Sequence, residues 1–363
     1  MTAAPRTAYV LPAGLALLVG IDAGLTLLRV WSPIHSGRLG EAHGVLMVLG
    51  FIGTLIALER AVALGQRAGY LVPALFGLGA LGLIAGFAPA AGVLVAGALG
   101  LCLLYVPLWR RQRDDAVLVS ALGAVLVAGG TVLWSRGADL ALVVPWLAGF
   151  VILTIAGERL ELARLAMPAQ ASRSLLATAT LICLSAAAAT LWPAVGFPLL
   201  GAALLLLTWW LWSYDVARRT VRGTGLPRYI AVCMLAGQAW LLVAGLIWLV
   251  AGSALAAGEG RAYDAVVHAV FLGFALSMIM AHAPTILPAV SRVALPYRPV
   301  LYLPWAVLQL SLIVRLWGGD WLGSVPAREI GGAGNAVALL LFVLTVLGLV
   351  LAPAPRVRQE ALR

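Results

Sequence analysis

Long apolar runs separated by short polar breaks most restrict how this chain can fold. The breaks are as short as APAAG (residues 88–92), SRGAD (135–139) and WPAVGF (192–197), and the sequence is 63% hydrophobic and 10% charged. A run of about 18 or more apolar residues matches the roughly 30 Å hydrocarbon core of a bilayer. The sequence therefore predicts an all-α polytopic membrane protein that forms one transmembrane domain over residues 1–363. We expect twelve transmembrane helices, near residues 8–30, 42–63, 70–87, 91–109, 116–134, 140–157, 175–192, 196–213, 228–251, 262–285, 300–316 and 331–352.

The arginines predict how these spans are oriented. All 24 cationic side chains of the Lys and Arg class are arginine. With a cytoplasmic N-terminus, 18 of them fall in cytoplasmic segments and six at outer ends, whereas the acidic residues divide seven to seven. Such a bias is the positive-inside rule, so we expect both termini in the cytoplasm. The net charge of +10 then sets topology and does not indicate a nucleic-acid partner.

Two other features narrow the class of protein. The first apolar run is too long for the apolar region of a secretory signal and lacks a clear cleavage site, so it is interpreted as the first span. The three cysteines, Cys102, Cys183 and Cys233, lie inside apolar runs and form no C-x-x-C motif. A disulfide framework, a thiolate zinc site and a covalently attached c-type haem are therefore not expected.

Spans 2, 6 and 10 share a short sequence pattern. The three segments are LGFIGTLIALER (residues 49–60), AGFVILTIAGER (148–159) and LGFALSMIMAHA (272–283). All three contain Gly-Phe, and His282 stands where the first two segments have Glu59 and Glu158. This spacing predicts three pseudo-repeats of four helices, a recognised architecture for membrane proteins. Chance similarity among helices rich in Gly, Leu and Ala is the alternative.

Two of the four histidines are predicted to lie at a similar depth in the membrane. His43 begins span 2 and His268 lies about two turns inside span 10, and both helices start from the predicted outer face. Two neutral imidazoles on facing helices are the usual axial ligands of a low-spin haem. Buried ionisable groups are expensive in a bilayer, which favours a functional role for both. Outer arginines, Arg29 and Arg38 above all, are candidates to pair with the haem propionates. Hydrogen bonding of each histidine within the protein is the alternative.

The other two histidines have less defined roles. His282 lies fourteen residues after His268 on the same helix face, about 21 Å away at the helical rise per residue. No second histidine is predicted near it. Its candidate roles are the ligand of a five-coordinate haem, a ligand of a metal shared with Glu59 or Glu158, part of a methionine-assisted metal site, and a plain hydrogen bond. His35 lies in the predicted outer loop, where it is a candidate copper ligand or an ordinary exposed histidine.

Three acidic residues lie in or at the ends of spans. Asp22 stands inside span 1, and Glu59 and Glu158 each precede an arginine at a predicted inner helix end. Each is a candidate for proton or ion handling, and a structural ion pair is the alternative for all three.

Two segments resemble a known family. HAVFLGFALSMIMAHAPTILPAV (residues 268–290) and EAHGVLMVLGF (residues 41–51) are similar to the tenth-span and second-span histidine motifs of NnrS-type proteins. This resemblance implies a twelve-span protein of the bacterial inner membrane that binds haem b and copper and takes part in nitric-oxide metabolism or nitrosative-stress defence. Its partners would be the lipid bilayer, haem, nitric oxide and an electron-donor protein. Ala281 stands where the family has glycine.

A more distant resemblance is to the catalytic subunit of haem-copper oxidases and nitric-oxide reductases. Those proteins also have twelve helices in three pseudo-repeats, with low-spin haem ligands on helices 2 and 10. This chain lacks paired histidines on spans 6 to 8 and a His-x-His on span 10, so a complete oxygen-reducing centre is not expected. The alternatives to a haem protein with redox activity toward nitric oxide are a transporter and an accessory protein that handles haem or copper.

Overall fold

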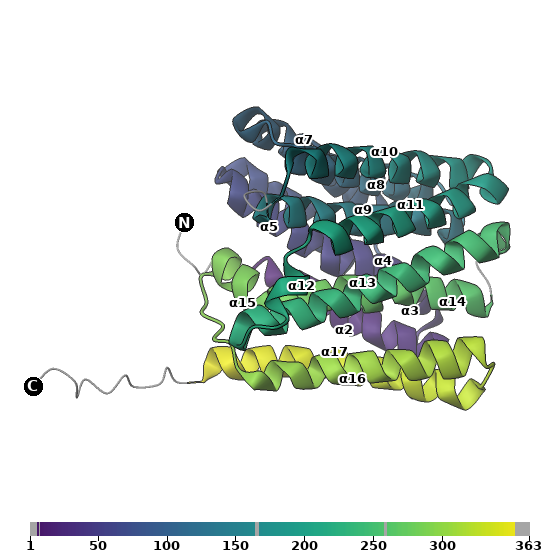
Figure 1. Ribbon diagram of the computed structural model, residues 1–363. Coiled ribbons are helices and arrows are strands. Elements are labelled where there is room, and N and C mark those ends of the chain that lie inside the picture. The colour runs from purple at the N-terminus through teal and green to yellow at the C-terminus, as the bar shows by residue number, and fades with distance from the viewer. Residues whose placement is uncertain (1–5, 7, 164–166, 258–259, 353–363) are drawn as a thin grey trace, which may run out of the picture.

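A computed structural model describes residues 6, 8–163, 167–257 and 260–352. Twelve of its helices are long and apolar enough to cross a membrane, which confirms the predicted number of spans, and the described residues contain no strand. Figure 1 shows the long helices lying alongside one another as one bundle.

The first four spans come from residues 10–112. Span 2 consists of an α-helical start, a π-helical stretch and an α-helical end. The elements are α2 (Val10–Leu27), α3 (Gly37–Glu41), α4 (His43–Val45), η1 (Leu46–Gly53), α5 (Thr54–Leu64), η2 (Arg67–Tyr70), α6 (Leu71–Ala85) and α7 (Ala90–Gln112).

The remaining eight spans follow in two further groups of four. The second group is α8 (Asp115–Ser135), α9 (Leu140–Ala163), α10 (Ala169–Leu191) and α11 (Pro193–Tyr214), followed by the short α12 (Ala217–Thr220). The third group is α13 (Gly225–Ala251) with η4 (Gly252–Ala257), α14 (Arg261–His268) with η5 (Ala269–Leu276) and α15 (Ser277–Ser291), η6 (Pro299–Leu301) with α16 (Tyr302–Ile313) and η7 (Val314–Trp321), and α17 (Val325–Leu351).

Several helices extend beyond the predicted apolar runs. α9 continues to Ala163 and span 10 continues to Ser291, whereas α10 begins at Ala169 and α17 at Val325. These extensions carry polar or charged residues, or prolines in the case of span 10. Hydropathy marks where the hydrocarbon ends, but the helix can continue as long as water or ion pairs satisfy its side chains.

Spans 2, 6 and 10 form the centre of the bundle. Their most apolar windows are 72%, 83% and 72% buried, against at most 61% for the other nine. Helix α9 contacts η5, and α15 contacts α5, so these three spans meet one another. Consecutive spans pack around them, and the last helix, α17, returns to the first, α2. This arrangement is the one expected for three groups of four helices.

Close approach of neighbouring spans depends on small residues. A Cβ atom added at Gly201 of α11 would lie 2.3 Å from the backbone nitrogen of Leu249 in α13. Membrane helices gain most from such close contacts, because burial of apolar surface gives no advantage over lipid.

The repeat positions meet at one end of the central spans, which we call the arginine end. Arg60 of span 2 pairs with Glu158 of span 6 at 3.4 Å, and Nη1 of Arg159 of span 6 donates to Nε2 of His282 of span 10 at 3.1 Å. Each contact therefore joins the arginine of one repeat to the Glu or His position of the next. Ala283 takes the place of the third arginine.

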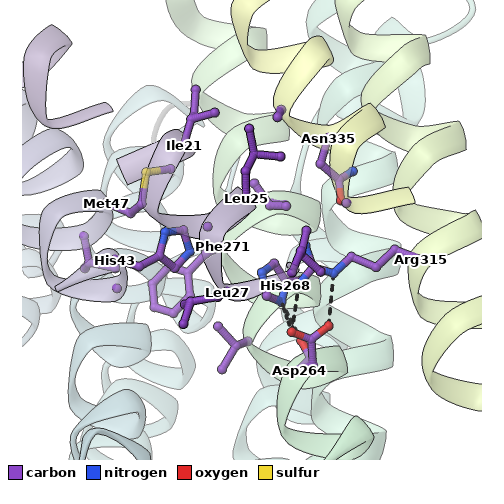
Figure 2. A pocket seen from close by; sticks show the side chains of 18 of the residues that line it. Ile21, Leu25, Leu27, His43, Met47, Asp264, His268, Phe271, Arg315 and Asn335 are labelled. Atoms are coloured by element: carbon purple, nitrogen blue, oxygen red, sulfur yellow. Dashed lines mark hydrogen bonds and ion pairs between the residues drawn. The ribbon is translucent and has the colours of Figure 1, made fainter. Parts of the chain in front are cut away.

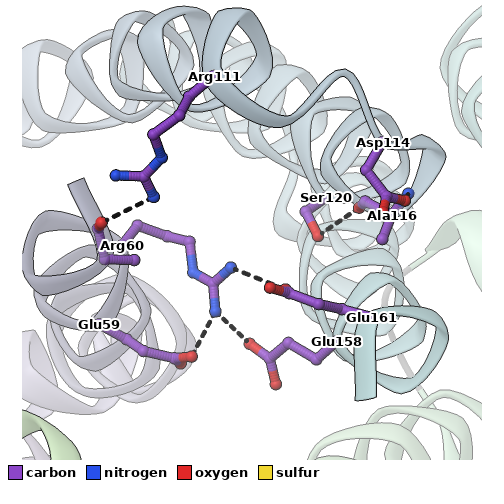
Figure 3. A network of polar contacts seen from close by, with 9 residues as sticks. Glu59, Arg60, Arg111, Asp114, Ala116, Ser120, Glu158 and Glu161 are labelled. Carbon is purple, nitrogen blue, oxygen red and sulfur yellow. Dashed lines mark hydrogen bonds and ion pairs between the residues drawn. The ribbon is translucent and has the colours of Figure 1, made fainter. Parts of the chain in front are cut away.

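The two arginines have further acidic partners. Arg60 also contacts Glu59 of its own helix and Glu161 of α9 at 3.9 Å (Figure 3). Arg159 donates from Nε to Asp215 at 2.9 Å, and the Asp215 side chain is only 1% exposed. Buried charges are tolerated only when they are paired in this way.

We expect Arg159→Met to destabilise the folded bundle by about 3–5 kcal/mol, because it leaves Asp215 buried without its counterion. Differential scanning fluorimetry of the detergent-solubilised protein should show a lower Tm. Arg136→Gln, in an exposed turn, is the matched control and should leave the Tm unchanged. Equal Tm values for the two variants would contradict a structural role for the Arg159–Asp215 pair.

Candidate functional site

A cavity lies at the opposite end of the central spans, which we call the cavity end. It measures about 250 Å³ and is lined by residues of α2, α4, η1, α9, span 10, η7 and α17. Most lining side chains are apolar, including Ile21, Leu25, Leu27, Met47 and Phe271 (Figure 2). The cavity is therefore a site for a largely apolar molecule with a few polar contacts.

His43 enters this cavity from the first turn of span 2. Its Nδ1 lies 2.7 Å from the carbonyl oxygen of Gly20 in α2. A carbonyl oxygen only accepts, so Nδ1 carries the proton and Nε2 keeps its lone pair. Nε2 has no hydrogen-bond partner among the described residues. Such a hydrogen bond on the far nitrogen is the usual way in which a protein orients a metal-binding imidazole.

His268 enters the same cavity from the end of α14 and has the same tautomer. Its Nδ1 donates to the carbonyl oxygen of Asp264 at 2.7 Å, one helical turn earlier. Its Nε2 likewise has no hydrogen-bond partner within the part of the chain that the structure describes. The structure thus brings together the two histidines that sequence analysis paired, each with an unprotonated Nε2.

An ion pair lies on the Nδ1 side of His268. The Asp264 carboxylate accepts two hydrogen bonds from Arg315 of η7, from Nε at 3.0 Å and from Nη2 at 2.8 Å, and its Oδ1 lies 3.3 Å from His268 Nδ1 (Figure 2). Arg315 is 6% exposed. The bidentate geometry fixes the carboxylate, and the carboxylate favours a proton on Nδ1.

Both histidines are followed at once by π-helix. η1 begins three residues after His43, and η5 begins directly after His268. Span 6 carries the same Gly-Phe pair but no histidine, and it is α-helical throughout Leu140–Ala163. π-Helical turns are rare and often occur at functional sites, where they change the direction of nearby side chains. Among spans 2, 6 and 10, π-helix therefore occurs in the two that carry a cavity histidine, and a third π-helix, η7, carries Arg315.

Glycines leave room around His43. A Cβ at Gly24 would lie 2.9 Å from His43 Cε1, and a Cβ at Gly44 would lie 3.3 Å from Leu140. Gly273 has a different role, because a Cβ there would lie 2.4 Å from Trp240 of α13. It permits close helix packing and does not line the cavity.

The arginines expected near the cavity lie elsewhere. Arg29 is exposed and adopts a left-handed backbone conformation, with φ of 59°. Arg38 donates to the carbonyl oxygens of Leu83 and Ile84 at 2.6 and 2.8 Å, so it caps the end of α6. The cations that line the cavity are Arg315 and Arg328.

Two other predicted residues lie in the loop region beside α2. Asp22 is 6% exposed, and its Oδ1 accepts from the backbone nitrogen of Ile34 at 3.0 Å. His35 Nδ1 lies 3.2 Å from Ser32 Oγ. Neither residue lines the cavity, and the Asp22 carboxylate holds the loop that follows span 1.

His282 differs from the cavity histidines at the atom that matters for ligation. Its Nδ1 donates to the carbonyl oxygen of Met278 at 2.7 Å, and its Nε2 accepts from Arg159. The lone pair of His282 Nε2 therefore already accepts a hydrogen bond. Glu59 and Glu158 both face Arg60, as described above. No group of three or more His, Cys, Asp or Glu side chains suited to a metal ion occurs among the described residues.

Asp264, Arg315 and Arg328 are among the cavity residues that sequence reasoning missed. Asp264 precedes His268 by four residues, which places both on one helix face, so its spacing was a usable signal. Arg315 and Arg328 were counted only for topology. Their contribution to the cavity depends on how spans 11 and 12 pack against spans 1 and 10, which the sequence does not reveal.

The family of this chain is established by a match over almost its whole length. Residues 6–351 match the family described as Domain of unknown function (DUF8744). The chain belongs to this family. No curated protein matches it in sequence.

A solved structure has a similar fold. A haem-copper terminal oxidase, determined as a dimer by cryo-EM, superimposes with a TM-score of 0.63 over 97% of this chain and 84% of its own, at 13% sequence identity. This likeness establishes a twelve-helix fold of the haem-copper oxidase type, as the distant resemblance in the sequence implied.

We expect Asp264→Asn to destabilise the protein by about 3–5 kcal/mol, because it removes the carboxylate that accepts both hydrogen bonds from the buried Arg315. The Tm in detergent should fall, whereas Asp139→Asn, at an exposed position, should leave it unchanged. The double variant Asp264→Asn/Arg315→Gln should lose less than the sum of the two single variants. Strictly additive losses would contradict coupling between the two side chains.

Proposed function

We propose that this protein is a b-type haem protein of a bacterial inner membrane, in which His43 and His268 ligate the iron of one haem at the cavity end. The observation that carries the proposal is the contrast among the membrane histidines. His43 and His268 each keep an unprotonated Nε2 at one apolar cavity, whereas His282 has its Nε2 on Arg159. Bis-histidine ligation needs two such nitrogens.

The remaining lining also suits a haem. The walls are mostly apolar, Gly24 allows the His43 ring to pack against α2, and Arg315 and Arg328 supply positive charge for propionates. The volume of about 250 Å³ is below the usual range for ligand pockets, roughly 300–1,000 Å³. Insertion of a macrocycle would therefore require flexible side chains such as Leu27, which is 56% exposed, to rotate outward.

The chain's own residues would set the properties of the bound group. Bound haem supplies one-electron chemistry, and the protein tunes it through ligands, charge and access. The Gly20 and Asp264 carbonyls hold the two imidazoles in the ligating tautomer. The Nδ1–H of His268 also faces the Asp264 carboxylate that Arg315 holds, whereas the Nδ1–H of His43 faces only a neutral carbonyl.

The fold likeness to a haem-copper terminal oxidase supports a redox role in a membrane. The resemblance of spans 2 and 10 to NnrS-type proteins supports nitric oxide as the ligand or substrate class, with a separate protein as electron donor. The copper site that this resemblance implies has less support, since the described residues hold no group of three or more His, Cys, Asp or Glu candidate ligands.

Replacing each histidine in turn tests the haem proposal. His43→Ala and His268→Ala should lose at least about tenfold in haem content by the pyridine haemochrome assay, because each removes an axial ligand. His282→Ala and His35→Ala are matched controls from the same chain and should retain haem. Imidazole added to His43→Gly should restore the spectrum. Full haem content in both cavity variants, or a colourless wild-type protein after haem supplementation, would contradict the proposal.

Nitric oxide is tested separately on haem-loaded protein. We expect its addition to the reduced protein to change the Soret absorption, because a small neutral ligand can reach an apolar cavity and compete with one of the two histidines for the iron. Carbon monoxide serves as a comparison for access without nitrogen-oxide chemistry. A spectrum unchanged by nitric oxide would contradict the nitric-oxide assignment and leave the haem assignment intact.

A further inference from the structure

A second pocket, of about 560 Å³, lies at the turn that follows α11. One short stretch of chain forms it. Its lining residues are Ser213, Tyr214, Asp215, Val216, Arg218, Arg219 and Arg222. The pocket is at the arginine end of the bundle, because Asp215 is the residue that Arg159 holds.

The pocket carries uncompensated positive charge. Three of its lining residues are arginines and one is acidic. That acid is already neutralised, since Asp215 accepts from Arg159 and from the backbone nitrogen of Ala217 at 2.9 Å. Arg219 and Arg222 are exposed and form no ion pair with any described residue.

The pocket also lies at the level of a membrane interface. The last turns of α11 expose large apolar side chains, with Leu206 at 49%, Trp209 at 64% and Trp212 at 56%. Tryptophan prefers the boundary between hydrocarbon and headgroups. The arginines follow Trp212 within ten residues of chain, which is consistent with guanidinium groups at the level of lipid phosphates.

We propose that this pocket binds the headgroup of an anionic phospholipid. Guanidinium groups bind phosphate oxygens in pairs with fixed geometry, and basic residues next to a transmembrane helix attract anionic headgroups. The positive-inside rule explains how many arginines lie at this end but does not explain why three of them surround one polar pocket. The proposal is independent of haem binding at the other end of the bundle.

A second arginine cluster at the same end of the bundle provides a matched control. Arg110, Arg111 and Arg113 lie at the end of α7, which is the same end of the bundle, and Arg111 donates to the Ala63 carbonyl at 3.0 Å. Arg110 and Arg113 are exposed. Replacing these two removes the same charge without touching the pocket.

The experiment titrates the purified full-length protein in neutral detergent with dioctanoyl phosphatidylglycerol and follows tryptophan fluorescence. Dioctanoyl phosphatidylcholine and inorganic phosphate form the comparison arms. We expect saturable binding of the phosphatidylglycerol, at least tenfold weaker binding in Arg219→Gln/Arg222→Gln, and a change of less than twofold in Arg110→Gln/Arg113→Gln. Binding of the phosphatidylcholine or of free phosphate should be at least tenfold weaker.

Several results would overturn the proposal. These are equal loss of affinity in both double variants, equal affinity for the zwitterionic lipid, and equal affinity for inorganic phosphate, which would assign the pocket to a soluble anion. Arg219→Lys/Arg222→Lys keeps the charge and guards against misfolding of the Gln variant. It should bind between wild type and the Gln variant, and wild-type affinity in it would contradict guanidinium recognition of the phosphate.

Discussion

The contacts from one repeat to the next at the arginine end organise the whole bundle. Arg60 reaches Glu158, and Arg159 reaches His282, so three central helices are joined through side chains at equivalent positions. These charges lie in helices that are otherwise apolar, where an unpaired charge would be expensive. Pairing across helices therefore specifies which helix lies next to which, a task that uniform apolar packing against lipid performs poorly.

The same residue type has two different environments in this fold. Each of the three membrane histidines donates Nδ1–H to a backbone carbonyl, and among the described residues only His282 has a hydrogen-bond partner at Nε2. At the arginine end Nε2 is an acceptor for a guanidinium, which makes the imidazole part of the structure. At the cavity end it faces apolar side chains, and π-helical turns begin next to both histidines. The neighbouring cation thus distinguishes His282, which is bonded within the protein at both ring nitrogens, from the two cavity histidines.

Much of the fold was predictable because a bilayer leaves few choices. Span number and the absence of strands among the described residues follow from apolar run lengths, whereas the central place of spans 2, 6 and 10 was not predicted. The pairing of His43 with His268 at one cavity followed from depth alone. The cavity arginines could not be predicted in this way. Arg29 and Arg38 were chosen because they are close to His43 in the sequence, whereas Arg315 and Arg328 reach the cavity through the packing of the last two spans. Likewise, nothing in the sequence indicated that Arg159 would donate a hydrogen bond to Nε2 of His282.

Ala283 leaves the set of inter-repeat contacts open at one place. Among the described residues, side-chain bonds join span 2 to span 6 and span 6 to span 10, but none joins span 10 back to span 2. His43 and His268 belong to those same two spans and face one cavity at the opposite end. An iron held by both imidazoles would supply the missing cross-link, so the cofactor would close the circle of three repeats as well as provide its chemistry. Loading would then be the event that locks the first and third groups of helices together.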